Sequence, residues 1–407
     1  MSGQFRDQVQ KFLRDATLSK AEVDRFVDPN APRWARFDAE LGYVPNDSRV
    51  PDGIDGSIST YSYGPLGERQ TMNYAARPCR ISTYGNSFTQ CHQVSDGETW
   101  QEVLAAHIGE PIRNFGVGGY GVYQAYRRLT RVELGPQGTT EYIILNIFDD
   151  DHYRNLDAYR LLRVGKWWRD YDRSLSTSMF HANPWCHVRL DPSTGGLVHR
   201  PNLCDTSESL YMLCDEDFLV SNYQDDLVVK LIVGGNVGEF GFLEEYEELA
   251  GVLGISLRTG NALEGSQAAQ QLYRAMAFRS SALIVESLGR ELEERGAKLM
   301  VLLSYSDKAV RQVLRHGPRA DEWFLRALEG LNVVFVDSLG IHVSDYQEFS
   351  VEPEVYVGRL YNGHYTPAGN HFFASSVRRD IVGWLSPPPP AYRDREMSFA
   401  AQAARLA

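Results

Sequence analysis

The sequence predicts an α/β fold: a three-layer α/β/α arrangement with a central parallel sheet, of flavodoxin-like type, plus an inserted lid or small accessory domain. Continuous apolar runs at residues 142–145 and 298–303 indicate buried strands. Helical periodicity follows or precedes such runs, most clearly at residues 99–107 and 265–296. Strands that are covered on both faces lose the alternation of apolar and polar residues, and helices must connect them when they run parallel. The alternation of these two patterns therefore predicts a parallel sheet.

Other segments extend this prediction towards both ends of the chain. Residues 4–27 show an amphipathic helical pattern that Pro29 ends, and residues 28–78 are rich in Pro, Gly, Asp and Tyr without a clear period. We expect one long helix followed by an irregular lead-in. The further elements expected are strands at residues 80–83, 111–115 and 332–337 and helices at residues 122–132 and 321–330.

The domain organisation expected from these patterns has four parts. They are a lead-in at residues 1–79, an α/β domain at 80–155 and 264–386, an insertion at 156–263, and a tail at 387–407. The insertion contains a hairpin signal at residues 192–196 and a cluster of aromatic residues, which more often indicates a core than a sugar-binding platform. The cluster consists of Trp167, Trp168, Tyr171, Phe180 and Trp185. Because the insertion follows an active-site strand, we expect it to cap the site.

Composition narrows the classes of partner. The chain of 407 residues has a formal net charge of −12, which argues against a nucleic-acid or anionic-membrane surface. It contains no apolar run of roughly 20 residues and no signal-peptide pattern at its start. Five cysteines, an odd number, indicate reduced thiols, so we expect a cytoplasmic protein. Aromatic residues make up 12% of the chain, which suits a small-molecule or oligosaccharide substrate.

Neither a cofactor nor a metal is expected. No Walker loop occurs, and the glycine-rich stretch at residues 116–121 does not match Gly-x-Gly-x-x-Gly. Five possible metal ligands in the insertion lack the paired Cys-x-x-Cys spacing of structural zinc sites. These residues are Cys186, His187, His199, Cys204 and Cys214. The tail can dock on a partner subunit, which leaves a homo-oligomer open.

Three short stretches carry the candidate chemistry. Residues 84–89 (Tyr-Gly-Asn-Ser-Phe-Thr) place Ser87 between a strand and a helix, where a tight turn exposes both its hydroxyl and its own N–H. Residues 114–121 are glycine-rich, and residues 362–370 contain His364. Each stretch also has a plain structural interpretation: Ser87 as a helix N-cap, the glycines as a closely packed loop, and His364 as a loop histidine.

In this order and spacing, the three stretches resemble the SGNH hydrolase superfamily, also called GDSL-like esterases and lipases. The resemblance implies that Ser87 is the nucleophile, with Asn86 in place of the usual aspartate beside it. It implies that the N–H of Gly119 contributes to the oxyanion hole and that His364 is the catalytic histidine. The resemblance covers residues 80–155 and 298–385.

Two positions depart from the pattern of that family. Residue Asp150 stands where the resemblance places an oxyanion-hole asparagine, and Asn362 stands where it places the acid that orients the histidine. An amide can fix the imidazole tautomer but adds no charge stabilisation, and loss of the triad carboxylate costs about 10⁴ in rate. A protonated Asp150 could donate to an oxyanion if burial and its neighbours Asp149 and Asp151 raise its pKa. The plain alternative for the three aspartates is a solvated helix start.

Three hypotheses for function follow. The first is a serine esterase or deacylase that acts on an acylated carbohydrate through Ser87 and His364, oriented by Asn362. The second is another carbohydrate-active enzyme, similar to a glycoside hydrolase. In it, carboxylates of residues 149–151 act as acid and base together with another acid from the insertion or from the loop at residues 352–354. The third is a non-catalytic carbohydrate-binding protein that keeps the pocket but has lost catalytic activity.

Overall fold

The computed structural model describes residues 2–31, 34–135, 138–165 and 183–393. The chain forms two compact units. The first consists of Met1–Asn46, Gly121–Arg127 and Asp150–Glu286, and the second of Asp47–Tyr120, Arg128–Asp149 and Ser287–Ala407. Two helices, α5 (Val122–Glu133) and α11 (Ala262–Glu293), run from one unit into the other.

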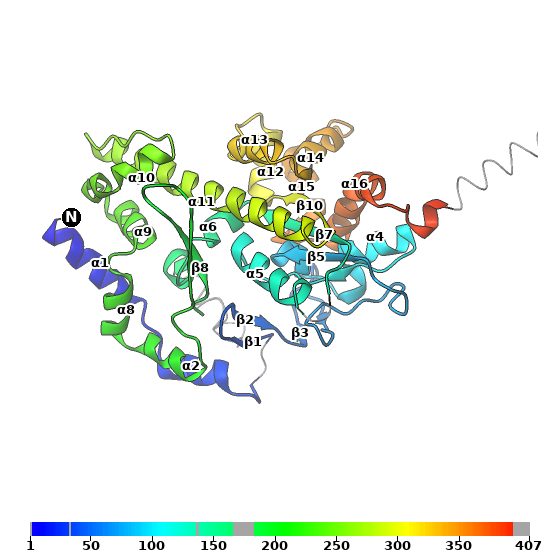
Figure 1. Ribbon diagram of the computed structural model, residues 1–407, viewed down its shortest axis with the longest axis horizontal. Coiled ribbons are helices and arrows are strands. Elements are labelled where there is room, and N and C mark those ends of the chain that lie inside the picture. Colours follow the sequence, from blue (N-terminus) through cyan, green and yellow to red (C-terminus); the bar gives the residue numbers. More distant parts are fainter. Residues whose placement is uncertain (1, 32–33, 136–137, 166–182, 394–407) are drawn as a thin grey trace, which may run out of the picture. The chain divides into compact units, whose positions relative to one another are not determined.

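A five-stranded parallel sheet forms the centre of the second unit and confirms the predicted α/β class. Its strand order is β11-β10-β7-β5-β6, and Figure 1 shows β5, β7 and β10 side by side. The strands are β5 (Ile81–Gly85), β6 (Arg113–Asn114), β7 (Tyr142–Phe148), β10 (Lys298–Ser304) and β11 (Val334–Asp337). In the register of β5 and β7, Gly85 lies opposite Asn146. Residues that follow β5 and β7 therefore leave the sheet at the same edge.

Helices and short hairpins complete the second unit. Helix α16 packs against α4, and α14 contacts β10. The helical elements are α3 (Ser87–Gln90), η1 (Asp96–Glu98), α4 (Trp100–Ile108), α12 (Asp307–Leu314), α13 (Glu322–Gly330), α14 (Ser338–Tyr346), α15 (Pro353–Leu360) and α16 (Pro367–Trp384). The hairpins pair β3 (Ser48–Val50) with β4 (Ser59–Tyr61) and β12 (Tyr361–Asn362) with β13 (His364–Tyr365).

The first unit is mainly helical, with two antiparallel hairpins. Helix α1 packs against α8 and α9. The hairpins pair β1 (Ala35–Asp38) with β2 (Gly42–Pro45) and β8 (His187–Leu190) with β9 (Leu197–Arg200). The helical elements are α1 (Gly3–Asp15), α2 (Lys20–Val27), α6 (Asp151–Arg154), η3 (Glu208–Cys214), α8 (Glu216–Tyr223), α9 (Leu227–Val237), η4 (Gly241–Tyr246) and α10 (Glu247–Val252).

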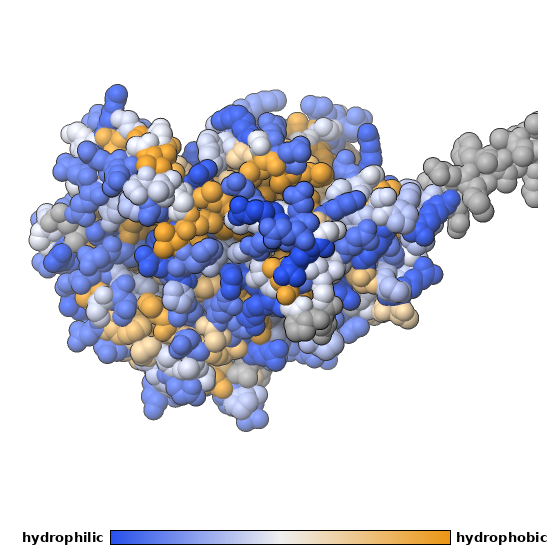
Figure 2. All heavy atoms as spheres, in the orientation of Figure 1, coloured by the Kyte–Doolittle hydropathy of each residue, from blue (hydrophilic) through white to orange (hydrophobic). Residues whose placement is uncertain are grey.

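Strands β7 and β10 supply much of the core of the second unit. Residues 142–147 and 300–304 are buried, as expected for strands covered on both faces. The molecular face in Figure 2 is predominantly hydrophilic, with scattered hydrophobic side chains. Within the described ranges, no helix combines the length and the apolar character that membrane crossing requires.

Two predictions about the start of the chain were wrong. Residues 4–27 form two helices and not one, because the Ser19 side chain accepts from the Glu22 N–H while Glu22 reaches back to Ser19, a capping box that starts α2. Residues 28–78 are not merely irregular, since they contain β1 to β4. The predicted hairpin at residues 192–196 is confirmed as the turn between β8 and β9. Most of the aromatic cluster falls outside the described residues, whereas Trp185 is fully buried.

Candidate active site

Ser87 is the first residue of α3 and follows β5 after a sharp turn. Gly85 has φ +154°, and a Cβ at this position would lie 2.4 Å from the Asn146 carbonyl oxygen, so the turn requires glycine. The Asn86 side chain caps α3 by accepting from the Phe88 N–H at 2.7 Å. The interpretation of Ser87 as the N-cap is therefore wrong. Asn86 caps the helix, and this leaves the Ser87 hydroxyl available for another partner.

That partner is His364, as predicted. The Nε2 atom of His364 lies 2.9 Å from Ser87 Oγ, although the two residues are 277 positions apart in the sequence. Ser87 is 7% exposed, so a small part of its surface reaches solvent. The hydrogen bond brings together the hydroxyl and the imidazole on which the esterase hypothesis depends.

Gln93 determines the tautomer of the His364 ring. Its Oε1 atom accepts from the His364 backbone N–H at 3.0 Å and lies 3.1 Å from Nδ1 of the same residue. Because a backbone N–H only donates, the Gln93 atom that it meets must be the acceptor oxygen. Nδ1 must then carry the proton, and the lone pair of Nε2 faces Ser87. This is the tautomer that a general base needs.

The backbone N–H groups of Ser87 and Gly119 are the donors predicted for a developing negative charge. Ser87 is the first helical residue, so its N–H has no acceptor within α3. Among the residues that the structure describes, neither the Ser87 N–H nor the Gly119 N–H donates a hydrogen bond. Gly119 also has φ +86°, a conformation that glycine adopts without strain. The predicted oxyanion donors are thus unoccupied.

The glycine-rich loop packs directly onto the serine turn. A Cβ at Gly116 would lie 2.1 Å from the Gln90 backbone nitrogen, which excludes any side chain there. The Val117 N–H donates to the Gly85 carbonyl at 3.0 Å, and the Gly118 N–H donates to Gln90 Oε1. These contacts hold the segment before Gly119 against α3, so the glycines are more than a flexible connection.

A buried arginine braces the loop that carries Gln93. Arg69 is 2% exposed, and its guanidinium donates to the carbonyls of Cys91 at 2.7 Å and of Gln90 and Val94. It also forms an ion pair with Asp96 at 2.9 Å. The loop needs such support because Cys91 and Gln93, at φ +61° and +69°, occupy the left-handed region without being glycine.

His92 is a buried, neutral imidazole near His364 and Arg69. Burial lowers its pKa well below the usual value, with further lowering by nearby His364 and Arg69. Its Nε2 lies 2.9 Å from Gln90 Oε1, the oxygen that also accepts from the Gly118 N–H. By the argument used for Gln93, that oxygen is an acceptor, so Nε2 of His92 carries the proton. His92 is thus a donor that helps to fix the Gln90 amide.

The three adjacent aspartates do not act as one group. Asp149 directly follows β7 in the second unit and accepts from the Ser306 hydroxyl at 2.6 Å and the Ser306 N–H at 3.1 Å. In the first unit, Asp150 forms ion pairs with Arg154 and Arg163, both at 2.8 Å. Asp151 pairs with Arg154 at 2.8 Å.

The expectation of a raised pKa for Asp150 was wrong. Burial alone would raise it, but the charges of Arg163 and Arg154 outweigh burial and hold the pKa of Asp150 well below the usual range. Asp150 is therefore an ionised partner of arginines and not a protonated donor for an oxyanion. The sequence argument considered the acidic neighbours of Asp150 and missed the arginines that follow it.

Asn362 does not take the role that sequence spacing gave it. It pairs with His364 across the short β12-β13 hairpin, and its side chain is exposed. The Nδ1 atom of His364 instead meets Gln93, six residues after Ser87. The group that meets Nδ1 is thus an amide, as in the prediction, but it belongs to Gln93 and not to Asn362. One signal was available: Gln90, His92 and Gln93 form a polar run directly after the serine turn.

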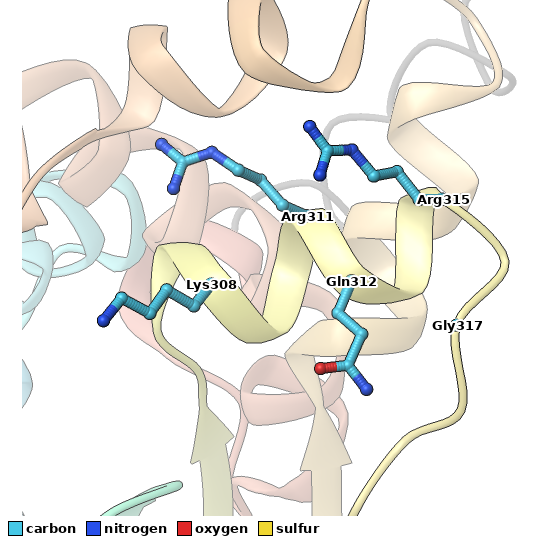
Figure 3. A pocket seen from close by; sticks show the side chains of 5 residues that line it. All are labelled: Lys308, Arg311, Gln312, Arg315 and Gly317. Atoms are coloured by element: carbon cyan, nitrogen blue, oxygen red, sulfur yellow. The ribbon is translucent and has the colours of Figure 1, made fainter.

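A separate surface cavity lies along α12. It has a volume of about 420 Å³ and is lined by Lys308, Arg311, Gln312, Arg315 and Gly317. Figure 3 shows Arg311 and Arg315 pointing to one side of the helix and Gln312 to the other, so the side chains do not converge on one point. Arg311 pairs with Asp307 and Arg315 with Glu354. The cavity contains none of the residues around Ser87.

Comparison with known proteins adds no assignment to this geometry. The sequence matches no protein-family model. It also matches no curated protein. The functional argument therefore depends on the residues around Ser87 and His364.

Proposed function

We propose that this protein is a serine esterase or deacylase in which Ser87 is the nucleophile and His364 the general base. The observation that carries the proposal is the 2.9 Å contact between Ser87 Oγ and His364 Nε2, with the opposite ring nitrogen bound to Gln93 Oε1. A serine hydroxyl is activated when it contacts a base whose other side contacts an orienting group. Gln93 takes the place of the orienting carboxylate.

The proposed reaction has two steps. Ser87 Oγ attacks the ester carbonyl carbon while its proton passes to His364 Nε2, and His364 then gives that proton to the departing alcohol. A water molecule, deprotonated by His364, releases the acyl group as a carboxylic acid and restores the serine. The N–H groups of Ser87 and Gly119 would hold the oxyanion of each tetrahedral intermediate.

We further propose membership of the SGNH hydrolase superfamily, with a three-layer α/β/α arrangement. Support comes from the order of the three motif stretches and from the position of Ser87 directly after a strand of the parallel sheet. The proposed substrate is an acylated carbohydrate, which accords with the aromatic content of 12%. The role of residues 156–263 as a lid or accessory domain stays a prediction.

The carboxylate-based alternative has less support. Asp150 and Asp151 each form ion pairs with Arg154, and Asp150 also with Arg163, which lowers its pKa. A general acid for glycoside cleavage needs a raised pKa. A purely binding protein has no need for the tautomer that Gln93 imposes on His364, so we prefer the catalytic interpretation.

Active-site labelling tests the proposal. A fluorophosphonate probe should label the wild-type protein, and Ser87→Ala should abolish labelling together with hydrolysis of 4-nitrophenyl acetate. Ser344→Ala, which changes an exposed serine on α14, is the matched control and should retain both. Loss of activity in Asp150→Asn with full activity in Ser87→Ala would instead support carboxylate chemistry. Full labelling of Ser87→Ala would refute the proposed nucleophile.

A further inference from the structure

Arg160, in the first unit, is a buried arginine whose guanidinium is not fully paired. The residue is 3% exposed, and its Nε and Nη1 atoms are buried without a hydrogen-bond partner among the residues that the structure describes. Burial of an unpaired polar group costs about 1–3 kcal/mol, and more when the group is charged. Proteins rarely keep such a group without a reason, and an absent ligand is one of the usual reasons.

The nearby carboxylates are already bound by other arginines. Asp150 contacts Arg154 and Arg163, each at 2.8 Å. Asp151 contacts Arg154, and Asp157 contacts Arg163, again at 2.8 Å. Two arginines thus share three carboxylates, while two nitrogens of the third arginine lack an acceptor. Burial also raises the pKa of Asp157, against the lowering effect of Arg163.

A second donor without a partner belongs to the same cluster. The hydroxyl of Tyr273, on α11 in the first unit, is buried and has no hydrogen-bond partner within the described part of the chain. Arg160 and Tyr273 both have Asp150 and Arg163 as charged neighbours. A guanidinium and a phenol are both groups that donate to anionic oxygens.

We propose that this cluster is a binding site for a small oxyanion, a carboxylate or a phosphate group, held by Arg160 with help from Tyr273. The Nε–H and Nη1–H groups of Arg160 lie on different edges of the guanidinium, and a negatively charged oxygen at either edge forms a charge-assisted hydrogen bond, which is stronger than one to a neutral acceptor. The site is independent of the Ser87 chemistry. It gives the protein a way to recognise an acidic molecule as a substrate group or an effector.

Thermal unfolding at constant ionic strength tests the site on the full chain. Potassium phosphate and potassium acetate, each titrated against potassium chloride, distinguish the two classes of anion. We expect one of them to raise the unfolding temperature with saturation, because a ligand of the native state stabilises it. The same response is expected in Ser87→Ala, so failure of the esterase proposal would not affect this result. Absence of a saturable response to both anions would overturn the site.

Variants locate the response at Arg160. Arg160→Met should abolish it, and Arg160→Lys should weaken the affinity about tenfold or more, because lysine lacks the planar set of donors. Tyr273→Phe should weaken the affinity for the anion by a smaller factor than Arg160→Lys. Arg36→Met, which changes an exposed arginine on β1, is the matched control and should bind as the wild type does. Wild-type affinity in Arg160→Lys or Arg160→Met would overturn the assignment.

Discussion

Removal of the Gln93 amide gives the sharpest test of how His364 is held. Gln93 Oε1 accepts two hydrogen bonds from His364, at 3.0 Å from the backbone N–H and 3.1 Å from Nδ1. In the transition state of the proposed reaction the ring is an imidazolium, and a hydrogen bond to a charged group contributes about 1.5–3 kcal/mol. Since 1.36 kcal/mol corresponds to a factor of ten, Gln93→Ala should lower kcat/KM by roughly 10- to 150-fold.

Gln93→Glu adds the charge that an amide lacks. The carboxylate keeps both acceptor positions, and its negative charge should raise the pKa of His364. Because His364 acts as a base only when neutral, activity is lost as the pH falls through its pKa, and this limb of the profile should move to higher pH. Above that limb the rate should exceed the wild-type rate, with about 10⁴ as the upper bound from triads that lose their carboxylate.

The assay is hydrolysis of 4-nitrophenyl acetate from pH 5 to about 9, with kcat and KM measured separately. Gln312→Ala removes an exposed amide on α12 and serves as the control. If Gln93→Ala keeps kcat/KM within about twofold of wild type, Gln93 does not orient His364. An unshifted profile for Gln93→Glu would refute the electrostatic part of the reasoning.

Two further predictions concern stability. Arg69→Met should lower the free energy of unfolding by about 3–5 kcal/mol in urea titrations, because it leaves Asp96 buried without its cation; an unchanged midpoint would contradict the bracing role. The pKa of Asp150 is lowered in the folded protein. Its ion pairs therefore stabilise the fold at pH values above the unfolded pKa of about 3.9, and this stabilisation is lost as the pH falls towards the pKa of the folded state. Asp150→Asn should therefore destabilise the protein at pH 7 and progressively less below about pH 4, and an equal loss at both values would exclude the ion-pair explanation.

The parallel sheet could be predicted because local patterns encode it, and the pair Ser87–His364 could be predicted through the resemblance of three short stretches to a known family. Buried strands such as β7 and β10 appear as apolar runs, and a serine between a strand and a helix has a recognisable context. The orienting group could not be predicted in this way. Its position depends on how the chain folds back after α3, which no periodicity records, and motif spacing therefore pointed to Asn362 instead of Gln93.

The aspartate run shows a different limit of sequence reasoning. Adjacent carboxylates suggest mutual repulsion and raised pKa values, but the sign of a shift depends on every charge nearby. Arg154 lies one helical turn after Asp150, a spacing visible in the sequence, whereas the contact with Arg163 needs the irregular segment between them. Side chains that are neighbours in sequence thus belong to different environments: Asp149 contacts Ser306, and Asp150 contacts arginines.

The loop after α3 explains why Gln93 can act from so near the nucleophile. Gln93 is only six positions after Ser87, and a regular helix over those positions would carry the amide away from the serine by about 9 Å along its axis. Left-handed conformations at Cys91 and Gln93 turn the chain back instead, at a cost of order 1–3 kcal/mol each. The carbonyls that this reversal leaves outside a helix are those that Arg69 binds. The orientation of His364 therefore depends on the buried cation of Arg69, which binds backbone carbonyls on both sides of Gln93.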